Sequence, residues 1–299
     1  NGDFKPYLLR SSDKGKSWTS ITSNLPERGS VYAIAEDHVN ANLLFAGTEF
    51  GVFFTVDGGK RWTQLKGGLP TISIRDIEIQ KRENDLVLAS FGRGFYVLDD
   101  YSPLREISES ALATVAEIYP IKDSWMYIEA TPLGLRGKGF MGESFYSADN
   151  PPVGAVFTFY LKDEIKTLKK QRQDKEKELA EKGQQAPYPT MDELRREDDE
   201  QKPYLLFTIK DAQGEVVNRI KEDPKKGVNR TVWNFRYPSV SPARLKKGEA
   251  SIFGSQDQGP LALPGKYSVS LAKVVDGEIT ELVAQQEFEC KVLGLATVS

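Results

Sequence analysis

Short segments rich in β-forming residues alternate with turn residues through the first third of the chain. Four such segments follow one another at 31–36, 42–47, 51–56 and 61–65. The connections between them are only a few residues long, so neighbouring strands should pair antiparallel. This stretch therefore predicts a small meander of four strands.

The meander belongs to an internal repeat with a period of 43–44 residues. The segment Ser11–Trp18 (SSDKGKSW) recurs 44 residues later as Thr55–Trp62 (TVDGGKRW), and Gly51 recurs 43 residues later as Gly94. Four antiparallel strands in a repeat of this length are typical of one β-propeller blade. About two and a half blades fit the repeat region. Residues 1–116 are therefore predicted to form a partial propeller that belongs to a larger protein.

The two echoed segments fall in the hairpin between the third and fourth strands of a blade. In such a hairpin the aspartate can accept hydrogen bonds from backbone N–H groups, and the glycine can adopt a positive φ. The tryptophan is expected to bury its ring between adjacent blades while its N–H reaches a carbonyl. These structural residues are Ser11, Asp13, Gly15 and Trp18 in the first segment, and Thr55, Asp57, Gly59 and Trp62 in the second.

The two segments resemble Asp-boxes, which are also called BNR repeats. Together with 91–100, 150–155 and 227–237, they make the chain similar to the C-terminal part of bacterial sortilin/BNR-like propeller proteins, which are often labelled glycosyl hydrolases. The resemblance implies that the box is a fold element on the propeller rim, away from the central substrate face. It therefore implies a structural role for Asp13 and Asp57. It also implies a secreted, periplasmic or cell-surface protein.

A second pattern covers residues 117–299. About seven short strands separated by turns predict an immunoglobulin-like or fibronectin-like β-sandwich, with Trp233 as a core ring beside Phe207, Tyr267 and Val269. The clearest of these strands are Gly154–Lys162, Tyr204–Lys210, Glu215–Lys221, Thr231–Arg236, Lys266–Val274 and Glu287–Val292.

A strongly charged insertion at about 162–202 interrupts the predicted sandwich. Leu161, Ile165 and Leu168 have the spacing of an apolar stripe on one helix. Thr190 followed by Glu193 is typical of a capping box that begins a second helix. Two interpretations remain open, a solvated helical hairpin and an arm that binds a partner, and mixed charge favours the first.

Composition excludes several chemistries. Lys and Arg number 40 against 43 Asp and Glu, a net charge of −3 that argues against nucleic acid as a partner. The single cysteine, Cys290, and the single histidine, His38, exclude disulfide frameworks, thiolate zinc clusters and multi-histidine metal sites. No apolar run approaches the roughly 18 residues of a membrane span. The G-x-G-x-x-G match at 137–142 leads into Asn-Pro-Pro rather than a helix, so no dinucleotide or other cofactor is expected.

Two classes of function are compatible with these observations. The first is a non-catalytic recognition or assembly module of a secreted or surface protein, which binds a protein or a glycan and whose propeller is completed by missing blades or another chain. The alternative is the C-terminal part of a glycoside hydrolase whose catalytic carboxylates lie mainly in upstream blades, since no carboxylate pair can be placed in this chain. Charged residues in Gly-rich loops are the candidates to face a ligand: Glu49, Arg93 and Glu143.

Overall fold

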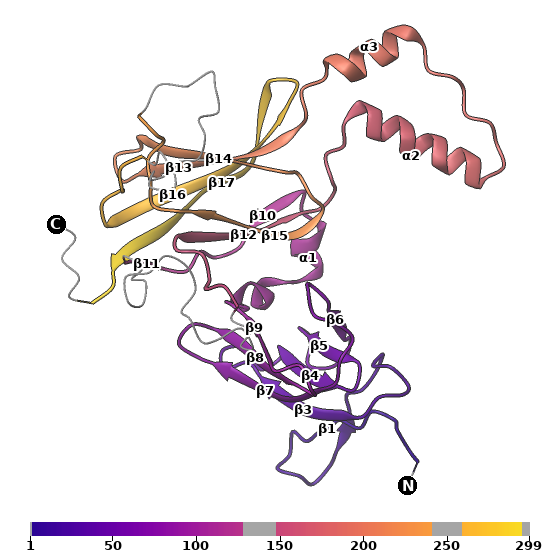
Figure 1. Cartoon of the computed structure of the whole chain (residues 1–299). Helices are drawn as coiled ribbons and strands as arrows, with labels where there is room; N and C mark the ends of the chain where they lie inside the picture. The colour runs from indigo at the N-terminus through magenta and orange to yellow at the C-terminus, as the bar shows by residue number, and fades with distance from the viewer. Residues whose placement is uncertain (1, 128–147, 241–258, 295–299) are drawn as a thin grey trace. The chain divides into compact units, whose positions relative to one another are not determined.

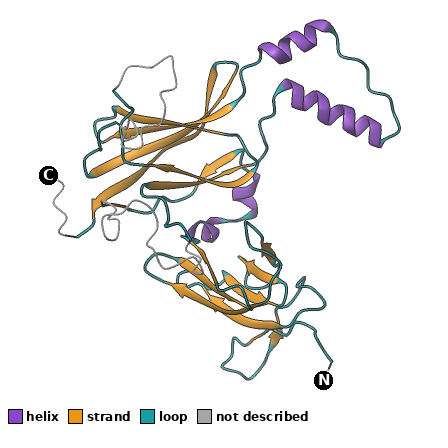
Figure 2. Cartoon of the chain, viewed as in Figure 1, coloured by secondary structure: helices purple, strands orange, loops and turns teal. Residues whose placement is uncertain are grey.

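The computed structural model describes residues 2–127, 148–240 and 259–294 (Figure 1). The chain divides into two compact units, Asn1–Ala111 and Leu112–Ser299. Strands make up 40% of the chain and helices 13%, so the fold is mainly β, as predicted. Figure 2 shows the same preponderance of strands in orange.

The first unit consists of three successive antiparallel sheets. A two-stranded sheet is followed by a four-stranded meander and then by a three-stranded meander, which confirms the partial propeller. The strands are β1 (Leu9–Arg10), β2 (Thr19–Ser20), β3 (Val31–Glu36), β4 (Leu44–Thr48), β5 (Gly51–Thr55), β6 (Thr63–Leu65), β7 (Ile74–Gln80), β8 (Asp85–Ser90) and β9 (Phe95–Leu98). The 3₁₀ helix η1 (Ser102–Glu106) and the short helix α1 (Glu109–Ala113) follow β9.

The first unit has two clusters of buried side chains: a larger one between the second and third sheets and a smaller one, which includes Trp62, between the first and second sheets. β4 is buried along its whole length, and β3 and β4 pack against β7. The alternation of buried residues along β7 and β8 turns Ile77, Ile79, Leu86 and Leu88 toward the larger cluster. Gly47 is required at the closest approach, because a Cβ there would lie 3.0 Å from the carbonyl oxygen of Ile74.

The second unit is a sandwich of two sheets. One sheet has the order β10-β12-β15 and the other the order β11-β17-β16-β13-β14. Among the described strands of this unit, only β11 and β17 pair in parallel. The strands are β10 (Ala116–Ile118), β11 (Ser124–Met126), β12 (Ala155–Leu161), β13 (Tyr204–Asp211), β14 (Val216–Glu222), β15 (Gly227–Trp233), β16 (Gly265–Val275) and β17 (Glu278–Val292). β17 begins nine residues earlier than the sequence predicts, and β15 covers 227–233 rather than 231–236.

Aromatic side chains from both sheets fill the core of the sandwich. The Phe159 ring of β12 lies 5.0 Å from the Phe207 ring of β13, centroid to centroid. Trp233 is 1% exposed and lies 5.0 Å from the Tyr267 ring, which confirms its predicted core position. Cys290 is buried and unpaired in β17, as expected of a small core residue.

The charged insertion between β12 and β13 forms two helices, α2 (Leu168–Glu181) and α3 (Met191–Asp199), with no fully buried residue in either. The capping box of Thr190 and Glu193 is confirmed. The predicted stripe is wrong, because Leu161 ends β12 and α2 begins only after Thr167, whose hydroxyl caps it. Arg172 of α2 forms a bidentate ion pair with Glu197 of α3, at 2.6 and 2.9 Å.

Candidate functional site

Three side chains of the first unit form a stack near the starts of β3 and β7. The guanidinium carbon of Arg75, on β7, lies 3.9 Å from the ring centroid of Tyr32, on β3. The same atom lies 5.1 Å from the ring centroid of Phe91, in the turn between β8 and β9. We call these residues the Tyr32–Arg75–Phe91 cluster. Both distances fall within the range of cation–π attraction.

Two equivalent turns lie at this end of the sheets. In the β4–β5 turn, the N–H of Glu49 donates to the carbonyl of Ser30 at 3.2 Å. In the β8–β9 turn, the N–H of Phe91 donates to the carbonyl of Ser73 at 2.8 Å. Each turn is thereby tied to the residue immediately before a strand, Ser30 before β3 and Ser73 before β7.

The structure places two of the ligand-facing candidates in these turns. Glu49 belongs to the first and Arg93 to the second, and both are exposed. The neighbouring Phe50 ring lies over Gly29, where a Cβ would come within 2.8 Å of it. The third candidate, Glu143, and the Gly-rich segment 137–142 lie outside the described residues.

Aromatic surface and unpaired positive charge coincide at this end of the first unit. Phe91 is 67% exposed, and Tyr32 and Phe50 are 38% and 39% exposed. Within the described part of the chain, neither Arg75 nor Arg93 has an ion-pair or hydrogen-bond partner. Such a surface can stack on a flat ligand and can donate hydrogen bonds to an acceptor. Sequence reasoning missed Arg75 and both rings of its stack.

The Thr55–Trp62 turn is closed by its own side chains. One carboxylate oxygen of Asp57 accepts hydrogen bonds from the Lys60 and Arg61 N–H groups at 2.9 and 3.0 Å, and from the Thr55 hydroxyl at 2.6 Å. Gly59 has a φ of +95°. Burial alone would raise the pKa of Asp57, but these hydrogen bonds outweigh it and lower the pKa below its usual value.

Trp62 joins this turn to the preceding sheet. Its side chain is almost fully buried, and its indole N–H donates to the carbonyl of Ile21 at 2.7 Å. The side-chain amide of Asn24 adds two hydrogen bonds to this contact. It donates to the Trp62 carbonyl at 2.9 Å and accepts from the Trp62 backbone N–H at 2.7 Å. The turn therefore connects the second sheet to the chain that leaves β2.

The Ser11–Trp18 turn has equivalent hydrogen bonds but lacks a covering sheet. Asp13 accepts from the hydroxyl and N–H of Ser17 and from the Ser11 hydroxyl, and these bonds lower its pKa to about 2. Trp18 is 60% exposed, so the expectation of a buried ring is wrong for this copy. The reason is that the described residues contain no strand before β1 to cover it. Gly15, with a φ of +84°, lies beneath the exposed ring.

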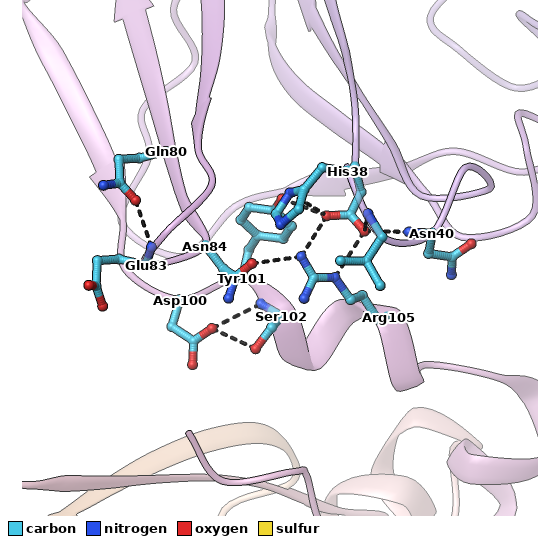
Figure 3. Close-up of polar contacts among 11 residues, drawn as sticks. His38, Asn40, Gln80, Glu83, Asn84, Asp100, Tyr101, Ser102 and Arg105 are labelled. Atoms are coloured by element: carbon cyan, nitrogen blue, oxygen red, sulfur yellow. Dashed lines mark hydrogen bonds and ion pairs between the residues drawn. The ribbon is translucent and has the colours of Figure 1, made fainter. Parts of the chain in front are cut away.

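A buried charged network at the other end of the sheets escaped sequence analysis. Asp37 follows β3, and its fully buried carboxylate accepts two hydrogen bonds from Arg105 of η1, at 2.7 and 2.9 Å (Figure 3). The Tyr101 hydroxyl donates to the same carboxylate at 2.6 Å, and Arg105 also donates to the side chain of Asn84 at 2.7 Å. The network ties the β3–β4 and β7–β8 turns to η1.

The charges in this network stabilise one another. Burial alone would raise the pKa of Asp37, but the hydrogen bonds from Arg105 and Tyr101 hold it well below its usual range. Burial and the Asp37 carboxylate raise the pKa of Tyr101. Because its donors and acceptors are paired in this way, we assign the network a structural role, in which it holds the β3–β4 and β7–β8 turns to η1. No short-range pattern marks the pairing of Asp37 with Arg105, because the two residues lie 68 positions apart.

The described residues contain no group of three or more His, Cys, Asp or Glu side chains that could hold a metal ion. In the same residues, no helix is both long and apolar enough to cross a membrane. A cavity of about 370 Å³ lies in the second unit between the base of the helical insertion and the β16–β17 hairpin, lined by aliphatic side chains and by charges of both signs.

No family model and no curated protein sequence matches the chain. Among solved structures, it is similar to an extracellular domain of BT4673 from B. thetaiotaomicron, with 14% identity and a TM-score of 0.26 over 96% of this chain and 28% of that one. It is also similar to PorZ, a surface component of the type-IX secretion system of Porphyromonas gingivalis, with 14% identity and a TM-score of 0.23 over 94% of this chain and 33% of that one. The chain thus spans about a third or less of these proteins. Similarity at this level carries no argument about activity.

Proposed function

We propose that this chain is a non-catalytic recognition module of a larger extracellular or surface protein, and that it binds a glycan or a protein through the Tyr32–Arg75–Phe91 cluster. One observation carries the proposal, namely exposed aromatic rings stacked about an arginine that has no acidic partner among the described residues. Large exposed rings are costly in water and are characteristic of binding surfaces. Of the two ligand classes, the flat rings favour a glycan, whose sugar rings have apolar faces.

We also propose that the repeats are Asp-boxes of the sortilin/BNR kind. The matching hydrogen bonds of the turns at Asp13 and Asp57 support this assignment. The exposed Trp18 supports a further proposal, that another sheet of the same kind, from missing blades or another chain, completes the propeller. Both assignments give the aspartates a structural role and leave the binding role to the opposite end of the sheets.

A glycan array tests the recognition proposal on the full chain. We expect at least one immobilised glycan to bind, and the Phe91→Ala variant to lose most of that binding because a stacking face is removed. Tyr188→Ala is a matched control, since Tyr188 is an aromatic residue that is 98% exposed in the helical insertion. Binding that survives Phe91→Ala but is lost in Tyr188→Ala would move the site to the insertion. No binding to any glycan would contradict the glycan form of the proposal.

A further inference from the structure

We infer that the ligand of the Tyr32–Arg75–Phe91 cluster is a carboxylated polysaccharide, in which a uronic-acid type of sugar gives its carboxylate to Arg75. This inference rests on the proposed function and specifies its ligand. It comes from three properties of the cluster: the position of the guanidinium over two rings, the absence of a competing acid among the described residues and the exposure of the rings.

The contacts with the rings leave the hydrogen-bond donors of Arg75 available. Its guanidinium carbon lies over the Tyr32 ring, 3.9 Å from the centroid, and over the Phe91 ring, 5.1 Å from the centroid. A cation–π contact holds the charge through its attraction to the ring face and does not satisfy the N–H donors as a hydrogen-bond acceptor would. The stack also holds the long side chain in place, which reduces the entropy lost when a ligand binds. The group is thus prepared for a planar acceptor with two oxygens.

No acid of the described chain occupies that edge. Other arginines here are neutralised, Arg105 by Asp37 and Arg172 by Glu176 and Glu197. Arg75 has no such partner within the described residues, and neither does Arg93, which lies two positions after Phe91 in the same turn. A carboxylate matches a guanidinium in both charge and geometry.

The rings favour a sugar acid over a small inorganic anion. Phe91 is 67% exposed and Tyr32 is 38% exposed. An inorganic anion would make no use of this apolar surface. A uronic acid combines a sugar ring with a carboxylate on the same residue, so a single unit can stack on a ring and pair with Arg75.

The test compares two forms of one polymer on the full chain. The probes are polygalacturonate and its methyl ester, which share a backbone and differ in charge, with alginate and hyaluronan as further acidic probes and dextran as a neutral one. We expect at least one acidic polymer to bind. If polygalacturonate binds, it should bind about tenfold more tightly than its ester, because a charge-assisted hydrogen bond usually has an effect of this size. Arg75→Gln should lose that difference, whereas Arg75→Lys should retain part of it, because lysine keeps the charge without the planar fork.

The control is Arg82→Gln, which removes an arginine whose side chain is 81% exposed at the opposite end of β7. This variant should bind as the wild type does, and unchanged tryptophan fluorescence will verify that each variant is folded. Equal binding of acid and ester, or binding to dextran alone, would overturn the carboxylate inference and leave the recognition proposal intact. Binding of poly-glutamate without any polysaccharide would identify an acidic peptide as the occupant and overturn the inference. If none of these polymers binds, the inference is overturned. If the glycan array also shows no binding, the glycan form of the proposed function is overturned as well.

Discussion

Asp57 shows how one carboxylate can stabilise a turn. It accepts two backbone N–H groups and one hydroxyl, all within the Thr55–Trp62 turn. Asp57→Ala would leave these donors without their acceptor, so we expect it to lower the free energy of unfolding of the first unit by about 1–3 kcal/mol. Urea unfolding followed by tryptophan fluorescence measures this loss.

Asp13→Ala is the matched control for that measurement. Its carboxylate makes an equivalent set of hydrogen bonds, but in a turn whose tryptophan is exposed. We therefore expect a smaller loss of stability than for Asp57→Ala. A loss as large as that of Asp57→Ala would show that the contact of the turn with the preceding sheet adds nothing to the role of the aspartate.

Asp37 should make the stability of the first unit depend on pH. Its pKa is held below the ordinary aspartate value by Arg105 and Tyr101, despite burial. A carboxyl whose pKa is lowered by folding stabilises the protein fully above its unfolded pKa, about 3.9, and loses that contribution as pH falls toward its folded pKa. We expect the free energy of unfolding to fall below about pH 4 in the wild type, and to fall less steeply in Asp37→Asn.

The same variant leaves the largely buried charge of Arg105 without an acidic partner. At pH 7 we therefore expect Asp37→Asn to cost about 3–5 kcal/mol, the usual effect of breaking a buried ion pair. Unfolding measured between pH 3 and 7 gives both quantities. An Asp37→Asn curve parallel to the wild-type curve would assign the acid sensitivity to other carboxyls whose pKa is lowered, such as Asp13 and Asp57.

At the scale of elements, α2 and α3 depend on charge rather than on apolar burial. Arg172 connects them through Glu197, and neither helix has a fully buried residue. Arg172→Ala should therefore increase hydrogen exchange across 191–199, and 1 M salt should weaken the same contact in the wild type. Lys182→Ala is the control, since Lys182 pairs with Glu178 at the end of α2 alone. Unchanged exchange in Arg172→Ala would mean that other contacts hold α3.

Elements set by local pattern could be predicted, and those set by distant contacts could not. The four strands of the second sheet and the capping box at Thr190 follow from neighbouring residues, and the sequence anticipated them. The extra length of β17 was missed because its first half is largely exposed, with polar and apolar residues mixed, and gains its partners only from β16. The Arg75 stack exists because β3 and β7 lie side by side, and no short-range pattern records that.

At the scale of the whole molecule, the first unit exposes an apolar face at each end of its row of sheets. Tyr7, Leu9 and Trp18 are 65%, 56% and 60% exposed at one end, and Phe95 and Val97 are 75% and 54% exposed at the other. Such faces favour association. We expect light scattering to show self-association that grows with concentration and weakens in Trp18→Ser. A monomer at every concentration, with uniformly protected amides over residues 1–60, would contradict this.

The reactivity of the Cys290 thiol can report how often the sandwich opens. Its thiol is 2% exposed, and burial, with a smaller contribution from Asp123 and Glu289, raises its pKa to about 12. An alkylating reagent needs the thiolate, so the folded chain should react only through molecules whose β16 and β17 have separated. Because the sequence has one cysteine, the labelling rate at a fixed pH should follow the open population of the second unit. It should therefore be unaffected by Asp57→Ala, which makes alkylation kinetics a way to determine whether the two units unfold independently.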